Sequence, residues 1–269
     1  MTVKKIGVGC NVGAQIDGTQ HAALVAATWI KKPDIMIMQD RSLGDADHYI
    51  NMIEDVIVRL QTHVKDVLEQ HDFPLIIGGD HAIVMGSLPY KENTLVVWID
   101  AHADVNTPET TLTHRIHGMP MAALMGYGDE RLLRHIHQPF LTPDQVVFYG
   151  VRDMDLKEEA FVNDKQMLML DHHQPIEETL DVLLKKAEAF DRIHISFDMD
   201  SFDPDVVPGV STPVPDGISI QQAKRMLKAL FKTNKVVSMD IVEFNPLIET
   251  RLSVNVLKQL VDLVELFQH

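Results

Sequence analysis

The feature that most constrains the fold is an apolar run that ends in alternating acidic and histidine residues. Leu95-Val-Val-Trp-Ile99 contains no polar residue, and Asp100-Ala-His-Ala-Asp104 follows it directly. A strand without polar alternation is buried on both faces, which is typical of a parallel sheet. Because side chains alternate along an extended chain, Asp100, His102 and Asp104 would point to the same side. Open α/β sheets place their sites at the carboxyl ends of strands, so the run predicts a site there.

Two further stretches end in the same way. Pro74-Leu-Ile-Ile77 precedes Gly78-Gly-Asp-His81, and His194-Ile-Ser-Phe197 precedes Asp198-Met-Asp200. The three strands together supply six candidate metal ligands: His81, Asp100, His102, Asp104, Asp198 and Asp200. Four carboxylates, two imidazoles and no thiolate suit Mn²⁺ and similar divalent ions better than a tetrahedral zinc site. Two divalent ions bridged by shared carboxylates would relieve the repulsion among the acids and could activate water.

The rest of the chain alternates apolar runs with helical patterns. Expected strands lie at residues 5–9, 34–38, 74–77, 95–99, 146–149, 167–170, 193–197 and 236–241. Expected helices lie at about 19–30, 46–70, 176–190, 219–232 and 250–267, with short helices after His81 and after His117-Gly118. This alternation predicts a three-layer α/β/α fold with a predominantly parallel eight-stranded sheet. The length of 269 residues fits a single α/β domain spanning residues 1–269.

Charge and cysteine content narrow the class of partner. The formal net charge of −15 disfavours nucleic acid and anionic membranes and would attract a cationic small molecule. Cys10 is the only cysteine, so an intramolecular disulfide is impossible and a reducing compartment fits. The N-terminal residues lack the apolar segment of a secretory signal, and no apolar run reaches membrane-spanning length. We therefore expect a cytoplasmic protein with no membrane partner.

Four motifs carry a resemblance to a known family. They are Gly78-Gly-Asp-His81, Asp100-Ala-His-Ala-Asp-Val-Asn-Thr-Pro108, Ser196-Phe-Asp-Met-Asp200 and Asp240-Ile-Val-Glu-Phe-Asn-Pro246. With these motifs the sequence resembles the ureohydrolases, and among them the arginases. The resemblance implies a three-layer fold with an eight-stranded parallel sheet and two Mn²⁺ per chain. It also implies attack of a metal-bridging hydroxide on a guanidinium carbon, which gives urea and an amine.

The resemblance also implies roles for individual residues. One ion would take His81 and Asp104 and the other His102 and Asp200, with Asp100 and Asp198 bridging. The catalytic positions would be Glu243, which binds the guanidinium group, and His117, which transfers protons. The matched substrate-binding positions are Asn106, Thr111 and Thr113 for the α-carboxylate, Asp155 and more weakly Glu158 for the α-amino group, and Thr212. His114-Arg115 depart from the pattern, because arginases typically carry small or amide residues there.

Several functions stay open at this stage. The leading hypothesis is hydrolysis of L-arginine to L-ornithine and urea. Agmatine or another guanidino or formimino compound is the nearest alternative, although the uninterrupted segment 106–117 and Asp155 favour an amino-acid head group. A binuclear phosphoesterase would need a Gly-Asn-His motif that the sequence lacks. A non-catalytic, metal-binding regulator would be expected to lose a ligand, His117 or Glu243, and none is lost. The resemblance also implies a homo-oligomer, either a trimer or a hexamer.

Overall fold

The centre of the molecule is one parallel sheet. The computed structural model describes residues 1–43, 49–136 and 138–268. Its eight strands run in the order β2-β1-β3-β8-β7-β4-β5-β6, and all neighbouring pairs are parallel. The strands are β1 (Val3–Gly9), β2 (Ile35–Met38), β3 (Phe73–Ile77), β4 (Thr94–Ile99), β5 (Val146–Tyr149), β6 (Leu168–Leu170), β7 (Arg192–Asp198) and β8 (Val236–Val242). The predicted eight-stranded α/β fold is confirmed.

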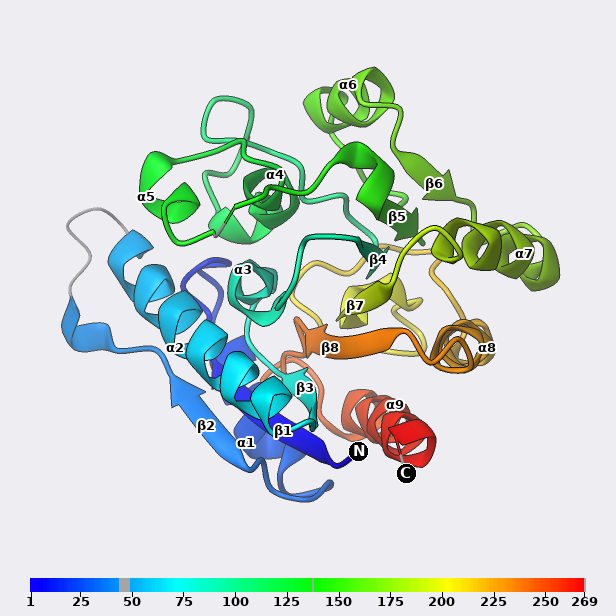
Figure 1. Ribbon diagram of the computed structural model, residues 1–269. Coiled ribbons are helices and arrows are strands. Elements are labelled where there is room, and N and C mark those ends of the chain that lie inside the picture. The colour runs from blue at the N-terminus through cyan, green and yellow to red at the C-terminus, as the bar shows by residue number, and fades with distance from the viewer. Residues whose placement is uncertain (44–48, 137, 269) are drawn as a thin grey trace.

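Helices cover both faces of this sheet (Figure 1). They are α1 (Ala22–Ala26), α2 (Ile50–Glu69), α3 (Val84–Ser87), α4 (Pro120–Leu124), α5 (Glu130–Leu133), α6 (Leu156–Asp164), α7 (Ile176–Ala187), α8 (Ile220–Phe231) and α9 (Arg251–Gln268). In Figure 1, α2 and α3 lie on one side of the sheet, and α7, α8 and α9 lie on the other. None of the helices within the described ranges is both long enough and apolar enough to cross a membrane.

The sequence-based helices differ from the structure at residues 19–30 and at α5 and α6. The helix expected at 19–30 is instead a 3₁₀ turn, Thr19–His21, followed by the five-residue α1. After α1 the backbone N–H groups of Thr28 and Trp29 bond to carbonyls three residues back, on Val25 and Ala26, so a turn replaces the α-helical pattern. The helices α5 and α6 were not predicted. Of the helix expected at 46–70, residues 46–48 lie outside the described residues.

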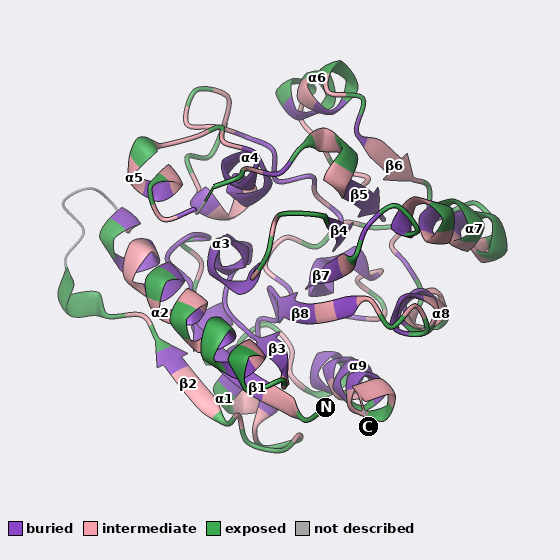
Figure 2. Ribbon diagram, viewed as in Figure 1, coloured by how far each residue is buried: buried purple, intermediate pink, exposed green. Residues whose placement is uncertain are grey.

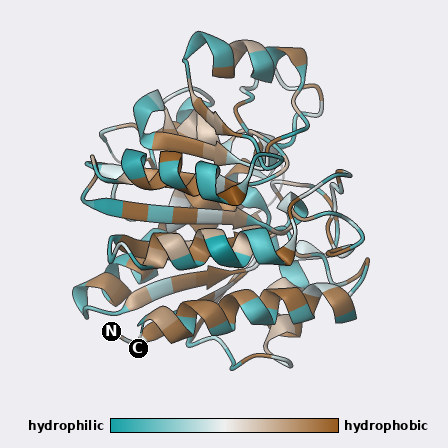
Figure 3. Ribbon diagram, turned by 90° about the vertical axis from the view of Figure 1, so that its right-hand side faces the viewer, coloured by the Kyte–Doolittle hydropathy of each residue, from teal (hydrophilic) through white to brown (hydrophobic). Residues whose placement is uncertain are grey.

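Two apolar cores, one on each face, hold the layers together. Along β4, Leu95, Val97 and Ile99 belong to the core under α7, α8 and α9, whereas Val96 and Trp98 belong to the core under α2, α3 and α4. Figure 2 shows the central strands as buried, whereas the edge strands β2 and β6 are mostly intermediate. In Figure 3 the helices carry hydrophobic stripes alternating with hydrophilic ones. Apolar side chains on both faces explain why the central strands read as uninterrupted apolar runs.

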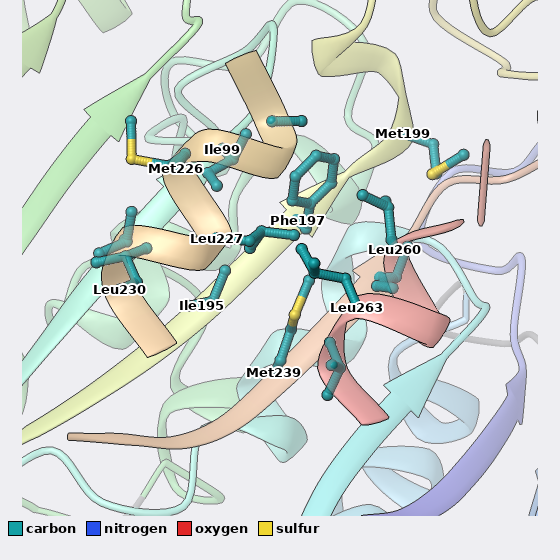
Figure 4. Packing of buried hydrophobic residues seen from close by; sticks show 14 of the residues in the cluster. Ile99, Ile195, Phe197, Met199, Met226, Leu227, Leu230, Met239, Leu260 and Leu263 are labelled. Atoms are coloured by element: carbon teal, nitrogen blue, oxygen red, sulfur yellow. The ribbon is translucent and has the colours of Figure 1, made fainter. Parts of the chain in front are cut away.

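The packing of α8 and α9 onto the central strands fixes the sheet beneath the site. Met226, Leu227 and Leu230 of α8 lie against the face of β7, and Leu260 and Leu263 of α9 approach β8 (Figure 4). All five are buried. Their burial anchors the two strands whose carboxyl ends carry the candidate site.

Candidate active site

The candidate site lies where four neighbouring strands end. These strands, β3, β8, β7 and β4, are consecutive in the sheet. Their register pairs Ile77 with Ile241, Ile241 with Phe197, and Phe197 with Ile99. The polar residues that follow each strand therefore start at the same level of the sheet edge. Sequence segments more than a hundred residues apart are brought together in this way.

One group of ligand atoms surrounds His81. Its Nδ1 atom lies 2.9 Å from Asp100 Oδ2, 3.1 Å from Asp198 Oδ2 and 3.3 Å from Asp104 Oδ2. In the described part of the chain, His81 Nδ1 and Asp100 Oδ2 are buried and make no hydrogen bond. An imidazole nitrogen facing three carboxylate oxygens is a donor set suited to a divalent cation. His81, Asp100 and Asp104 accordingly form one group that could hold a metal ion.

A second group adjoins the first through Asp100. The Nδ1 atom of His102 lies 3.2 Å from Asp200 Oδ2 and 3.5 Å from Asp100 Oδ1. Asp100 thus presents one oxygen to His81 and the other to His102. Asp100, His102 and Asp200 form the second group that could hold a metal ion. Two groups that share a carboxylate fit a pair of ions bridged by Asp100.

Burial and mutual repulsion also favour cations here. Desolvation, followed by the negative charge of Asp100, raises the pKa of Asp104 to about 6. Desolvation also raises the pKa of Asp198 well above its usual value, and the charges of Asp200 and Asp100 add to the effect. Carboxylates held this close together bind protons unless a cation neutralises their charge instead. The residues present therefore fit a binuclear metal centre.

Neighbouring side chains fix the orientation of His81. Its ring stacks on Trp98 with the centroids 3.9 Å apart and the planes 3° from parallel. On the other ring nitrogen, Nε2 lies 2.9 Å from Ser196 Oγ, which donates to Asp240 Oδ1 at 2.6 Å. Asp240 also contacts His194 Nε2 at 3.1 Å. A ligand histidine whose second nitrogen is held this way keeps one tautomer, with Nδ1 free for a metal. The sequence analysis did not identify this chain of polar contacts.

Glu243 lies beside the ligand groups with one oxygen unused. Its Oε1 accepts from the His81 backbone N–H at 2.9 Å and lies 2.9 Å from His117 Nδ1. Its Oε2 is buried and has no hydrogen-bond partner among the described residues. The backbone of Glu243 adopts φ +62°, a conformation that side-chain-bearing residues seldom take outside special sites. An unpaired buried carboxylate oxygen is costly and suits a cationic ligand.

His117, the residue predicted to transfer protons, contacts Glu243. Burial lowers its pKa, but the charge and hydrogen bond of Glu243 outweigh burial and raise the pKa to about 8. His117 sits in a 3₁₀ turn, Ile116–Gly118, that precedes α4. A histidine with a pKa near neutrality that borders a cavity can donate or accept a proton.

A cavity of about 250 Å³ opens onto these groups. Its lining contains thirteen of the fourteen residues predicted from the sequence: His81, His102, Asp104, Asn106, Thr111, Thr113, His117, Asp155, Glu158, Asp198, Asp200, Thr212 and Glu243. Asp100, the fourteenth, is fully buried, with its Oδ2 2.9 Å from His81 Nδ1. The structure therefore brings all fourteen into one region, although their roles stay predictions.

Contacts among the lining residues order the cavity wall. The Thr212 hydroxyl donates to Asp200 Oδ2 at 2.8 Å, and Asn106 Nδ2 donates to Asp155 Oδ2 at 3.0 Å. Asp155 caps α6 by accepting from the backbone of Glu158, whose carboxylate accepts from the Asp155 N–H in return. This capping box fixes both acids at the cavity wall.

Four residues to which the sequence analysis assigned no role also line the cavity. They are Leu112, Arg115, Gly118 and Asp153. Near them, the guanidinium of Arg152 donates to six carbonyl oxygens and joins the turn after β7 to residues 214–215. The pair His172-His173 is outside the cavity, where His172 Nε2 contacts the Asp216 carbonyl at 2.8 Å. The departure at His114-Arg115 drew attention to this part of the wall, and of the two residues Arg115 lines the cavity.

The parallel α/β sheet carries two carboxylate- and imidazole-lined ligand groups at its carboxyl edge, beside an acidic pocket. This combination defines a metal-dependent hydrolase of the ureohydrolase class. Comparison with known proteins makes the assignment specific. A profile of the Arginase family matches residues 19–263. The chain belongs to the arginase family and is a hydrolase that acts on the guanidino group of arginine.

Individual relatives agree with this family. An arginase of Entamoeba histolytica is 36% identical over 224 residues, which covers 78% of this chain and 74% of that protein. An arginase of Bacillus subtilis is 36% identical over 246 residues, covering 86% and 81%. The crystal structure of the Entamoeba histolytica arginase in complex with L-ornithine matches with a TM-score of 0.87 at 30% identity, and 98% of each chain is covered. The resemblance inferred from the four motifs is confirmed.

Proposed function

We propose that the site binds two Mn²⁺ per chain through His81, Asp100, His102, Asp104, Asp198 and Asp200, and that the adjoining cavity binds L-arginine in preference to agmatine. The observation that carries this proposal is Glu243 Oε2, a buried carboxylate oxygen without a partner in the described residues. It borders a cavity that also contains the ligand side chains. A planar guanidinium group would satisfy this oxygen.

The metal centre supplies one part of the chemistry. When bound, the two ions would lower the pKa of water and so raise the fraction of hydroxide, the nucleophile, at neutral pH. His81 and Asp104 would hold one ion, His102 and Asp200 the other, and Asp100 and Asp198 both. The carboxylate of Asp100 supports this division, because its two oxygens face different histidines.

Glu243 orients the guanidinium group. Its Oε1 is already held by the His81 N–H and by His117, so its position is fixed before substrate arrives. A carboxylate that accepts from a guanidinium makes a charge-assisted bond with defined direction. The carbon to be attacked would thus be presented to the ligand groups in one orientation.

His117 moves protons at the cavity wall. Hydrolysis releases the side-chain amine of ornithine, which leaves only after its nitrogen is protonated. The Nδ1 of His117 faces Glu243, and the ring lines the cavity. With a pKa of about 8, the imidazolium is present at neutral pH and can deliver this proton.

The other end of the cavity fits an amino-acid head group. Asp155 would accept from the α-ammonium group, with Glu158 behind it in the same capping box. Asn106, Thr111 and Thr113 would donate to the α-carboxylate, and Thr212 lines the wall between the two ends. Agmatine lacks the carboxylate, so these donors would have no partner in an agmatine complex. Unpaired donors of this kind disfavour the smaller substrate.

The test is urea release by the Mn²⁺-loaded protein, with L-arginine and agmatine assayed side by side. We expect urea from L-arginine and much less from agmatine at the same concentration. Equal or greater release from agmatine would overturn the substrate assignment while leaving the metal centre intact. Metal-loaded protein that released urea from neither compound would favour a regulator or another guanidino or formimino substrate.

We also propose a cytoplasmic homo-oligomer, either a trimer or a hexamer. The proposal is supported by the family and by the single cysteine of the chain. Light scattering on the metal-loaded protein would measure the mass of the assembly, and a mass equal to one chain would contradict it.

A further inference from the structure

We propose that Arg115 is a specificity-determining residue whose guanidinium pairs with the α-carboxylate of the substrate, so that this chain recognises the carboxylate by an ion pair as well as by neutral donors. The inference rests on the proposed function, because it assumes that the cavity binds an amino acid.

The charges that line the cavity carry the first step. Seven lining residues are acidic: Asp104, Asp153, Asp155, Glu158, Asp198, Asp200 and Glu243. Among the described lining residues, Arg115 is the only arginine, and there is no lysine. Even with metal ions on three of these acids, four carboxylates would remain. A free carboxylate entering this cavity would meet net repulsion unless a cation were beside it.

The second step concerns what Arg115 contacts. Within the ranges that the structure describes, its guanidinium has no ion pair and no hydrogen bond to protein. Arg152, which lies near the cavity, differs in this respect, because its guanidinium donates hydrogen bonds to six backbone carbonyls. Arg115 is partly buried, and its guanidinium N–H groups remain available to a ligand. A partly buried guanidinium that lines a pocket is suited to a planar, bidentate anion.

The backbone of Arg115 is held next to the positions for the head group. Its N–H donates to Thr113 Oγ1 at 3.3 Å, and its carbonyl accepts from the Gly118 N–H at 3.3 Å. It also begins the 3₁₀ turn that carries His117. The residue is therefore tied on one side to a hydroxyl proposed to bind the carboxylate and on the other to the proton-transfer residue. Arg115 lines the same cavity as both of these residues.

The consequence is a sharper choice between substrates. Asn106, Thr111 and Thr113 can donate hydrogen bonds to a carboxylate, but they are neutral, so each discriminates less strongly than a charge-assisted bond from an arginine. An arginine left without its anion in an amine complex also adds a positive charge beside the cationic ligand. Arg115 therefore favours a carboxylate-bearing ligand and disfavours a decarboxylated one.

The test compares binding of two probes to the Mn²⁺-loaded protein by titration calorimetry. L-ornithine carries the carboxylate, and 1,4-diaminobutane is the same molecule without it. Arg115→Gln should weaken L-ornithine about 10- to 100-fold, the range expected for one hydrogen bond to a charged group. It should leave 1,4-diaminobutane unchanged or bound more tightly. Arg115→Lys should recover part of the L-ornithine affinity, because it restores the charge without the bidentate geometry.

Arg192→Gln is the matched control. Arg192 begins β7, at the amino-terminal end of the strands and far from the site at their carboxyl ends, and the variant has the same change in charge. It should bind both probes like the wild type. In turnover, Arg115→Gln should raise KM for L-arginine by a similar factor and leave kcat close to its original value.

Equal L-ornithine affinity in wild type and Arg115→Gln would overturn the inference, as would an equal loss for both probes. Failure of the wild type to bind L-ornithine would also overturn it. The proposed function fails by a different result, because wild-type protein that binds L-ornithine in an Arg115-dependent way but releases no urea would contradict only the proposed reaction.

Discussion

His81 Nδ1 and Asp100 Oδ2 lie 2.9 Å apart, and neither makes a hydrogen bond in the described part of the chain. Both atoms are buried, so each would be costly in isolation. A cation bound by both removes this cost, and it also relieves the repulsion that raises the pKa of Asp104 and Asp198. The ligand atoms divide into two groups that share Asp100.

Asp200→Ala should empty one metal subsite and leave the other. Asp200 belongs to the group with His102 and Asp100, while His81 and Asp104 are in the other group. Metal analysis after dialysis should find about one Mn²⁺ per chain where the wild type holds about two, and urea release should be nearly abolished. Asp205→Ala is the control, because Asp205 is exposed and five residues further on. Two ions and full activity in Asp200→Ala would contradict the ligand assignment.

Ser196→Ala should weaken metal binding although it changes none of the six proposed metal ligands. Ser196 bridges His81 Nε2 and Asp240, and its loss frees the imidazole to rotate or change tautomer. Contacts of this kind are worth about 10- to 100-fold in metal affinity. Competition with a fluorescent chelator would measure that loss.

Ser238→Ala is the matched control for Ser196→Ala. Ser238 is equally buried, lies on β8 and contacts His194 at 2.7 Å, so it reaches His81 only through His194, Asp240 and Ser196. We expect it to lose stability but to keep most of the Mn²⁺ affinity. The same loss of affinity in both variants would mean that the buried polar chain acts on stability alone.

Glu243→Gln should abolish turnover and spare the metal centre. The amide can still accept from the His81 N–H, but it lacks the charge that pairs with a guanidinium. Loss of a charge-assisted bond and of orientation should lower kcat/KM by at least about 100-fold. Metal content should stay at the wild-type level. Loss of metal together with activity would show that Glu243 supports the ligand groups and would remove the reason to assign it to substrate.

The strands and the metal ligands could be predicted from the sequence because both are local signals. A strand buried on both faces is a continuous apolar run, and the ligands follow each run within a few residues, as in Ile99 and Asp100. The helix α6 gave no such signal, since Glu158 and Val162 are its only buried residues among the described ones. Its capping acids were interpreted only as possible substrate contacts, although they also start a helix.

The supporting contacts of the site could not be predicted, because they depend on strand order. Ser196 and Asp240 lie on β7 and β8, far apart in sequence, and meet only because those strands are neighbours in register. Arg115 lies in a loop without periodicity, and nothing in its local sequence says which way the side chain points. The position of such residues is set by tertiary packing, so it is visible only in the folded chain.

Glu158 should make stability fall with pH between about 4.5 and 7. Burial, with smaller contributions from Asp104 and Asp155, raises its pKa from 4.5 to about 7. The folded state then binds more protons than the unfolded state across this window, so the free energy of unfolding declines as pH rises through the folded pKa and is highest below the unfolded pKa. A shift of this size corresponds to about 3 kcal/mol at most. Glu158→Gln keeps the capping geometry and stays neutral, so the metal-free variant should gain stability over wild type as pH rises to 8, when followed by urea unfolding at each pH. The exposed neighbour variant Glu159→Gln should reproduce the wild-type profile, and parallel profiles for wild type and Glu158→Gln would refute the assignment of this pH dependence to Glu158.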